Sequence, residues 1–297
     1  MQRSLVINAD DLGLTVGVND GIFDAHDRGV LTSASIFANA PATSNAVARA
    51  QRRPSLGVGC HLTLVDGRPT LPPARVPSLI EDDGRFPRSW KPFIVSCLLG
   101  RVSLAEVELE LTAQIDRIRS AGLALTHLDA HKHVHAYPPI FSIVTRLAER
   151  FQIPVVRVPF ERWPGLHGDT SQKRTAAGQA LMNAAMLPWA RRDYRSAARA
   201  GVRTPHFIGR TQTGVLSAPA LEAMVRALPP GVTELMVHPG YVDEALTRLN
   251  TRLLDARADE VNLLTHPNTF DLLINQRITL IRHDLSLSEY RSLRHVS

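Results

Sequence analysis

The sequence LVINADDLG, residues 5–13, joins a short apolar run directly to the adjacent carboxylates of Asp10 and Asp11. An apolar run of this length is typical of a buried β-strand. A helix is predicted next, over about 17–28, and Gly29 closes it. The pattern therefore predicts a βα unit, with the two carboxylates at the carboxyl end of its strand, where barrel enzymes place their reactive groups.

The same alternation continues along the chain. Ser103 is the expected N-cap of a strongly amphipathic helix. Strands are predicted at 31–40, 56–64, 123–129, 153–158, 234–238 and 277–281, and helices at 43–53, 103–120, 139–151 and around 171–200. Strands that alternate with helices form right-handed βα units around a parallel sheet. Six or more such units in under 300 residues predict an α/β fold, a closed or nearly closed (β/α) barrel.

Two stretches interrupt this rhythm. Residues 66–102 are rich in proline and glycine and end in an apolar run. Residues 159–215 hold Trp163, Pro164 and the helix expected around 171–200. We interpret both stretches as insertions on one domain that spans residues 1–297.

Composition excludes several classes of protein. Hydrophobic residues make up 44% and charged residues 21% of the 297 residues, as in soluble globular chains. No run reaches the roughly 18–20 apolar residues that a membrane span needs. The start of the chain has two carboxylates by residue 11, unlike a secretory signal peptide, and two cysteines make no disulfide framework. We therefore expect a reduced, cytoplasmic protein.

The positive charge is concentrated in one stretch. Residues 146–210 contain 12 Lys and Arg against 4 Asp and Glu, a net +8, whereas the whole chain carries +6. Such a band attracts nucleic acid, an acidic ligand or anionic lipid headgroups, and it can equally be a solvated surface. The sequence has no nucleic-acid recognition motif, so we expect no nucleic acid as a partner. The oligomeric state stays open.

Asp10 and Asp11 suggest a site for a cation. Two neighbouring carboxylates repel each other unless a cation or a shared proton offsets their charges. The competing interpretation is a turn or a helix cap, because Asp-Asp-x-Gly is also favourable turn chemistry.

Histidines supply the partners that a metal site would need. His61 lies inside the predicted strand GCHLTL (59–64), and four of the chain's 12 histidines occur in THLDAHKHVH (126–135). Neutral imidazoles are the commonest protein ligands for zinc and related metals. A helical turn would place His131 and His135 on one face, whereas a strand would align every second residue from 127 to 135. The spacing thus predicts a metal site without selecting its histidines.

Two further residues stand out in predicted strands. His238 follows ELMV (234–237) and suits a core residue, a fourth ligand or a general acid. Arg157 lies inside the predicted strand 153–158, where an unpaired charge would be costly. A carboxylate partner is therefore expected for Arg157, with Asp10 and Asp129 as the candidates.

Taken together, these segments resemble the YdjC-like (ChbG-type) carbohydrate deacetylases. The matching signatures are NADDLG (8–13), GCHLT (59–63), THLDAHKHVH (126–135) and MVHPG (236–240), in family order. The resemblance implies an irregular (β/α) barrel related to the NodB-type polysaccharide deacetylases. It also implies a divalent metal and hydrolysis of the acetamide of an N-acetylated sugar.

The resemblance also implies roles for individual residues. The implied metal ligands are Asp11, His61 and His131; the implied catalytic residues are Asp10 as the base, His238 as the general acid and Arg157 as the group that orients Asp10; the substrate-binding residues are Asp129, His133 and His135. The HxxxH pair of NodB-type enzymes makes His131 with His135 a rival choice of ligands. Zinc suits this histidine-rich set, and magnesium, manganese or cobalt are alternatives.

The sequence is most similar to the hopanoid-associated (HpnK-type) branch, which implies N-acetylglucosaminyl bacteriohopanetetrol as the substrate. Alternatives are a chitooligosaccharide deacetylase acting on diacetylchitobiose, a metal-dependent phosphoester hydrolase and a non-catalytic glycolipid-binding protein. The apolar runs 90–99 and 181–189 suit a lipid-borne substrate, and four arginines follow the second run: Arg191, Arg192, Arg195 and Arg199. Apolar groups beside arginine are typical of peripheral contact with an anionic membrane, here the inner face of the cytoplasmic membrane, although core or dimer contacts would give the same pattern.

Overall fold

The computed structural model describes residues 2–161, 173–249 and 251–284, and the side chains of 173–185 are not described. Trp163 and Pro164, which the sequence placed in the second insertion, lie outside the described residues. Both cysteines are buried and free. Within the described part of the chain, no helix combines the length and the apolar character needed to cross a bilayer.

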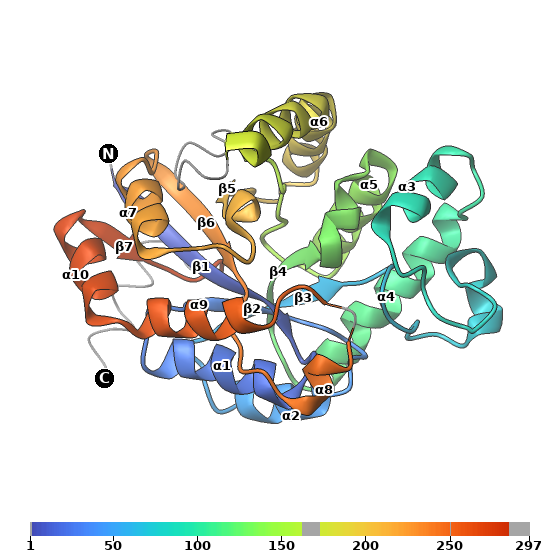
Figure 1. The fold of residues 1–297 in the computed structure, drawn as a ribbon. Helices are drawn as coiled ribbons and strands as arrows, with labels where there is room; N and C mark the ends of the chain where they lie inside the picture. The colour runs from blue at the N-terminus through green and yellow to red at the C-terminus, as the bar shows by residue number, and fades with distance from the viewer. Residues whose placement is uncertain (1, 162–172, 250, 285–297) are drawn as a thin grey trace.

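The centre of the fold is a sheet in which every strand pair is parallel. Its strands are β1 (Arg3–Leu12), β2 (Ser33–Ile36), β3 (Gly57–Leu62), β4 (Leu125–Ala130), β5 (His206–Ile208), β6 (Gly231–Val237) and β7 (Ile278–Leu280). They follow the order β4-β3-β2-β1-β6-β5, and β7 pairs with the first residues of β1. Because all strands run the same way, their carboxyl ends meet at one end of the sheet (Figure 1).

The sheet curls until its two edges approach each other. Isolated bridges join Val156 to Leu128 of β4 and Glu161 to Phe207 of β5, so the segment between them spans the gap. The result is the irregular, nearly closed barrel that the sequence predicts. The predicted strand 153–158 is wrong as a regular strand, because only isolated bridges form there. Pro154 and Pro159 explain this, since proline has no N–H to donate to a ladder.

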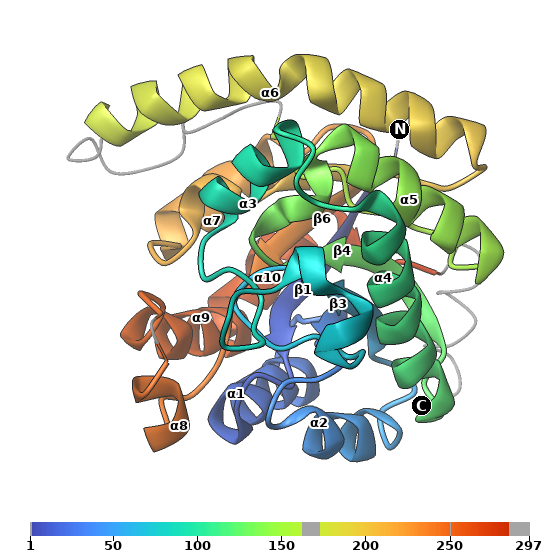
Figure 2. The ribbon, with the colours of Figure 1, turned by 90° about the vertical axis from the view of Figure 1, so that its right-hand side faces the viewer.

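Helices surround the barrel (Figures 1 and 2). They are α1 (Val16–Asp27), α2 (Thr43–Ala50), α4 (Leu104–Ser120), α5 (Pro138–Arg150), α7 (Ala218–Arg226), α8 (Glu244–Thr247), α9 (Asp255–Thr265) and α10 (Pro267–Asn275). Ser103 caps α4 as predicted, since its hydroxyl accepts the Glu106 N–H.

The two stretches that interrupt the sequence pattern lie beside the carboxyl end of the barrel. Residues 66–102 contain two short 3-10 helices (Pro73–Arg75 and Pro77–Leu79) and α3 (Trp90–Leu98). Residues 159–215 contain α6 (Lys173–Arg199), which crosses one side of the molecule in Figure 2, and also β5, a strand of the sheet. Both α3 and α6 contact the 3-10 segment η3 (His131–Ala136), which directly follows β4.

Candidate metal and catalytic site

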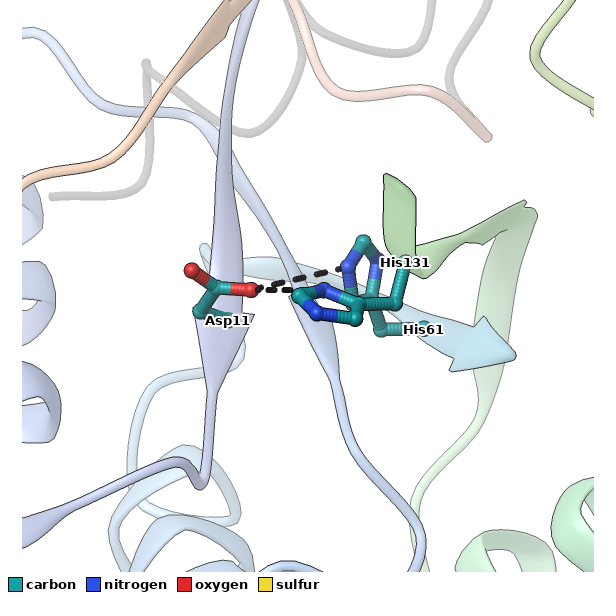
Figure 3. Close-up of side chains that lie close together, drawn as sticks. All are labelled: Asp11, His61 and His131. Carbon is teal, nitrogen blue, oxygen red and sulfur yellow. Dashed lines mark ion pairs between the residues drawn. The ribbon is translucent and has the colours of Figure 1, made fainter. Parts of the chain in front are cut away.

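Three strand ends bring Asp11, His61 and His131 together (Figure 3). Asp11 is the next-to-last residue of β1, His61 is the next-to-last residue of β3, and His131 begins η3 directly after β4. Asp11 Oδ1 lies 3.7 Å from His61 Nε2 and 3.4 Å from His131 Nδ1. The structure therefore places the three predicted ligands around one point.

Asp129 fixes the proton on His61. Its Oδ1 lies 2.8 Å from His61 Nδ1, and because a carboxylate only accepts, Nδ1 carries the hydrogen. The lone pair of His61 is then on Nε2, which faces Asp11. Asp129 is fully buried and also accepts the Ser35 hydroxyl at 2.7 Å. It orients the histidine, and the substrate-binding role that the sequence resemblance implies for Asp129 stays a prediction.

His131 lies between two carboxylates. Its Nδ1 faces Asp11, and its Nε2 lies 3.7 Å from Oδ2 of Asp66, a residue to which the sequence assigns no role. Burial acts to lower the pKa of His131, but Asp11 and Asp66 outweigh burial and raise that pKa to about 9. A positive charge is thus stabilised where a bound cation would lie.

The donor set fits a divalent metal. One ligand atom from each of Asp11, His61 and His131 lies within 4.8 Å of the others. Two imidazole nitrogens and one carboxylate oxygen, with a coordination position left open, are the ligands of a catalytic zinc site. Asp10, His61 and Asp129 also lie this close. In that second group, however, Asp129 bonds the protonated nitrogen of His61 and Asp10 bonds an arginine, so the first group fits a metal better.

Strained backbone gathers around the same point. Within the described part of the chain, six non-glycine residues have positive φ, and four of them are Asp11 (71°), Asp66 (62°), Lys132 (51°) and His133 (55°). Each such residue costs on the order of 1 kcal/mol or more unless its surroundings hold it in place. The surrounding structure therefore maintains these positions at an energetic cost, as is common at functional sites.

Arg157 forms a bidentate ion pair with Asp10 in the barrel interior. Its Nη1 and Nη2 donate to the two carboxylate oxygens of Asp10 at 2.8 and 2.7 Å, and both residues are buried. Arg157 also pairs with Asp129 at 2.8 Å, so both carboxylates named as candidates from the sequence are its partners. Burial acts to raise the pKa of Asp10, but Arg157 outweighs burial and holds that pKa well below its usual range. Asp10 is therefore ionised at neutral pH.

His238 lies at the end of the neighbouring strand. It follows β6, whose last residue, Val237, pairs with Ala9 of β1, and its side chain is buried. Burial lowers the pKa of His238 to about 4, although Asp10 and Asp11 act in the opposite direction. The imidazole is therefore neutral at rest.

His133 and His135, the two histidines for which the resemblance implies substrate binding, differ in environment. His135 is buried, stacks on Phe141 and donates from Nε2 to the Arg157 carbonyl at 2.9 Å. The structure does not bring it to the metal ligands, so the rival pair of His131 and His135 is not formed. His133 is half-buried and packs edge-on against Phe207, which leaves it nearer to solvent than His135.

Helix α9 supplies two residues that sequence reasoning missed. Arg257 is buried and donates to Asp11 Oδ2 at 2.5 Å. Glu260, one turn later, accepts the backbone N–H of His238 at 2.5 Å. Neither residue follows a predicted strand, so nothing in the local pattern marked them. Together they hold the ends of β1 and β6 in position.

Comparisons with known proteins identify the family of the chain. The sequence model of the YdjC-like protein family matches residues 4–275. A carbohydrate deacetylase of Brevibacillus brevis is 36% identical over 277 residues, covering 93% of this chain and 97% of the relative. A carbohydrate deacetylase of Geobacillus stearothermophilus is 33% identical over 284 residues, covering 95% of this chain and 98% of the relative.

A solved structure shares the fold. A protein of Enterococcus faecalis named for cellobiose-phosphate cleavage superposes with a TM-score of 0.75 at 27% identity, covering 96% of this chain and 98% of that one. The family match, the two relatives and this structure each span nearly the whole chain. The chain belongs to the YdjC-like protein family.

Proposed function

We propose that this protein is a metal-dependent N-deacetylase that hydrolyses the acetamide of an N-acetylglucosamine-type sugar to acetate and the free amine. One observation carries the proposal: the open set of Asp11, His61 and His131 lies beside a carboxylate, Asp10, that Arg157 holds ionised. The two relatives named as carbohydrate deacetylases support the same reaction class.

Asp11, His61 and His131 would hold the metal. Zinc suits two imidazoles and a carboxylate, and magnesium, manganese or cobalt would also accept this set. When bound, such an ion polarises an amide carbonyl and acidifies water. Arg257 and Asp129 keep Asp11 and His61 in place, since each bonds the side of its partner that faces away from the shared point.

Asp10 would act as the general base. Arg157 fixes both of its oxygens, so the carboxylate is oriented before a substrate arrives. It takes a proton from the water that attacks the acetyl carbonyl. Because its pKa is held so low, Asp10 is a weak base and gives that proton up readily to the next acceptor.

His238 would pass a proton to the departing amine. An amine leaves an amide poorly until it is protonated, so the C–N bond breaks as the nitrogen gains its proton. His238 is neutral at rest because its pKa is lowered to about 4. The proton it delivers is therefore one that it acquires during the reaction, and Asp10 on the adjacent strand is the source we propose.

A lipid-borne sugar is the substrate that we propose, N-acetylglucosaminyl bacteriohopanetetrol, as the sequence resemblance implies. Helix α3 supports this, because it buries Phe93 and Cys97, whereas apolar side chains on α3 and at its C-cap are exposed: Trp90, Val95, Leu98 and Leu99. Exposed arginines on α6 add positive charge: Arg191, Arg192, Arg195 and Arg199. Both helices contact η3, which begins with His131, so both helices lie close to the site. Part of the predicted apolar run 181–189 lies outside the described side chains.

Peripheral contact with the anionic inner face of the cytoplasmic membrane follows from the same surface. Basic residues near such a membrane contribute about 1 kcal/mol each, and apolar side chains add to this. We expect the protein to sediment with vesicles that contain anionic lipid, and Leu98→Ser with Leu99→Ser to weaken that binding. Unchanged sedimentation of this variant would exclude α3 as the contact surface.

A soluble chitooligosaccharide is the alternative substrate. Acetate release from the glycolipid in detergent and from diacetylchitobiose, each with and without chelator, separates the two. We expect chelator-sensitive release from the glycolipid alone. Release from diacetylchitobiose alone would retain the deacetylase and exclude the lipid substrate. Release from neither would favour a non-catalytic glycolipid-binding protein, a role that would not need Asp10 and Arg157 to be so arranged.

A further inference from the structure

Asp66 lies beside the candidate metal ligands without being one of them. It follows β3 by four residues, and its side chain is 38% exposed. Its Oδ2 lies 2.7 Å from Lys132 Nζ and 3.7 Å from His131 Nε2. One carboxylate oxygen therefore faces both a charged lysine and a candidate ligand.

The two candidate histidine ligands have matching surroundings. His61 turns one nitrogen to the metal position and the other to Asp129. His131 turns Nδ1 to the metal position, and its Nε2 faces Asp66. A histidine that binds a metal usually donates its second N–H to a carboxylate or a carbonyl, which fixes the ring and strengthens the ligand. Asp66 lies where that partner of His131 belongs.

Residues 66–67 and 86–88 are hydrogen-bonded to each other at the base of the loop that lies between them. We call this pair of segments the neck, and Asp66 is its first residue. The Asp66 N–H donates to the Pro87 carbonyl at 2.9 Å, and the Phe86 N–H donates to the Gly67 carbonyl at 3.0 Å. Lys132 Nζ reaches both sides of the neck, since it also donates to the Arg88 carbonyl at 3.2 Å. Lys132, the residue next to His131, thus ties the neck to η3.

Backbone geometry supports a functional role for the ion pair between Asp66 and Lys132. Asp66 and Lys132 both adopt left-handed φ values, 62° and 51°. An ordinary surface ion pair contributes little to stability and does not by itself explain two strained residues. The strain places the Asp66 carboxylate and the Lys132 ammonium at the His131 ring.

We propose that Asp66 is a positioning residue that fixes the His131 ring for metal binding and, with Lys132, couples occupancy of the metal site to the order of the neck. The inference rests on the metal site of the proposed function. Coupling of this kind is reciprocal: if an ordered neck favours metal binding, metal binding orders the neck by the same free energy.

Metal affinity tests the first half of the proposal. Zinc affinity of the metal-free chain would be measured by competition with a chromogenic chelator. Asp66→Asn removes the charge, and asparagine tolerates the left-handed backbone. We expect zinc to bind about 10–100-fold more weakly. The matched control is Asp83→Asn, an exposed carboxylate between the two sides of the neck that pairs only with Arg85 among the described residues; its affinity should not change.

Hydrogen exchange tests the second half. In the wild type, zinc should slow exchange of the Asp66 and Phe86 amides, which make the bonds across the neck. Lys132→Met should speed their exchange and reduce the protection that zinc confers. It keeps the Asp66 carboxylate, so its zinc affinity should fall less than that of Asp66→Asn.

The outcomes separate this inference from the proposed function. If the wild type binds one zinc and Asp66→Asn binds it equally well, the role of Asp66 is wrong and the deacetylase proposal stands. If zinc leaves exchange across the neck unchanged, the coupling is wrong. If the wild type binds no divalent ion, the proposed function and this inference both fail.

Discussion

Arg157 and Asp10 form a two-point ion pair in the barrel interior, with contacts of 2.8 and 2.7 Å and both side chains buried. The same arginine also pairs with Asp129 and Glu234. One guanidinium does not balance three carboxylates, and burial raises the pKa of Glu234 to about 7. The interior therefore favours additional positive charge close to Asp10, which a divalent ion on Asp11, His61 and His131 would supply.

Replacing Arg157 with lysine should lower kcat strongly while the protein still folds. Lysine keeps the charge but loses the planar fork that holds both oxygens of Asp10. We expect kcat to fall about 100-fold or more and KM to change little, as for a misplaced catalytic group. Arg226→Lys, in an exposed i,i+4 pair with Glu222, is the matched control and should leave both constants unchanged. Wild-type kcat in Arg157→Lys would contradict the positioning of Asp10 by Arg157.

Asp10→Asn should separate catalysis from metal binding. Asparagine keeps the shape of the side chain but does not accept a proton from water, and general bases contribute about 100- to 10,000-fold. We expect a loss of kcat in that range while the protein still binds one zinc. Retained turnover would remove Asp10 from the role of base, and lost zinc binding would show that it acts through the metal site.

Gly59→Ala should destabilise β3 beside His61. A Cβ at position 59 would clash with the His127 ring, which bonds the Ser35 hydroxyl at 3.0 Å. Overpacking of this kind costs about 1–3 kcal/mol, measured as the free energy of unfolding in urea. The double variant with His127→Ala should cost less than the sum of the two single changes, because the clash is removed. Additive costs would show that the two residues do not compete for space.

Asp193 on α6 should make stability depend on pH. It is buried, neither carboxylate oxygen has a hydrogen-bond partner among the described residues, and burial raises its pKa to about 8. The folded chain therefore holds this proton more tightly than the unfolded chain. The stability linked to it is fully present below about pH 4, the usual carboxyl pKa, and is lost as the pH rises to about 8.

Asp193→Asn tests this relationship. The amide is close in shape to the neutral carboxyl, so the variant should match the wild type near pH 4 and be more stable by about 1–3 kcal/mol at pH 8. Urea denaturation across this range measures the difference. A difference that does not change with pH would mean that Asp193 does not titrate in this window.

Parts of the site were predictable because a parallel barrel brings its strand ends together. Asp11, His61 and His131 each follow or end a strand that the apolar pattern marks, so their convergence follows from topology. Asp66 and Arg257 were not predictable in this way. Asp66 depends on a left-handed turn, and Arg257 reaches Asp11 from helix α9, far away in sequence.

Local geometry explains the remaining differences. From the sequence, the segment after β4 could be a helical turn, which pairs His131 with His135, or a strand, which aligns every second residue. The structure adopts neither of these regular conformations. Lys132 and His133 both adopt left-handed φ, so the segment after β4 follows neither a regular helical turn nor a strand. Strand β5 lies within residues 159–215, which we interpreted from the sequence as an insertion, so no strand was predicted there.

Zinc stoichiometry measured together with acetate release tests the central claim most directly. The chain would be stripped of metal, titrated with zinc, and assayed on the acetylated glycolipid and on diacetylchitobiose, with His61→Ala as the comparison. The account predicts that acetate release rises in proportion to bound zinc up to one ion per chain, and that His61→Ala neither binds zinc tightly nor releases acetate. Full acetate release from the stripped wild type, or from His61→Ala, would contradict it.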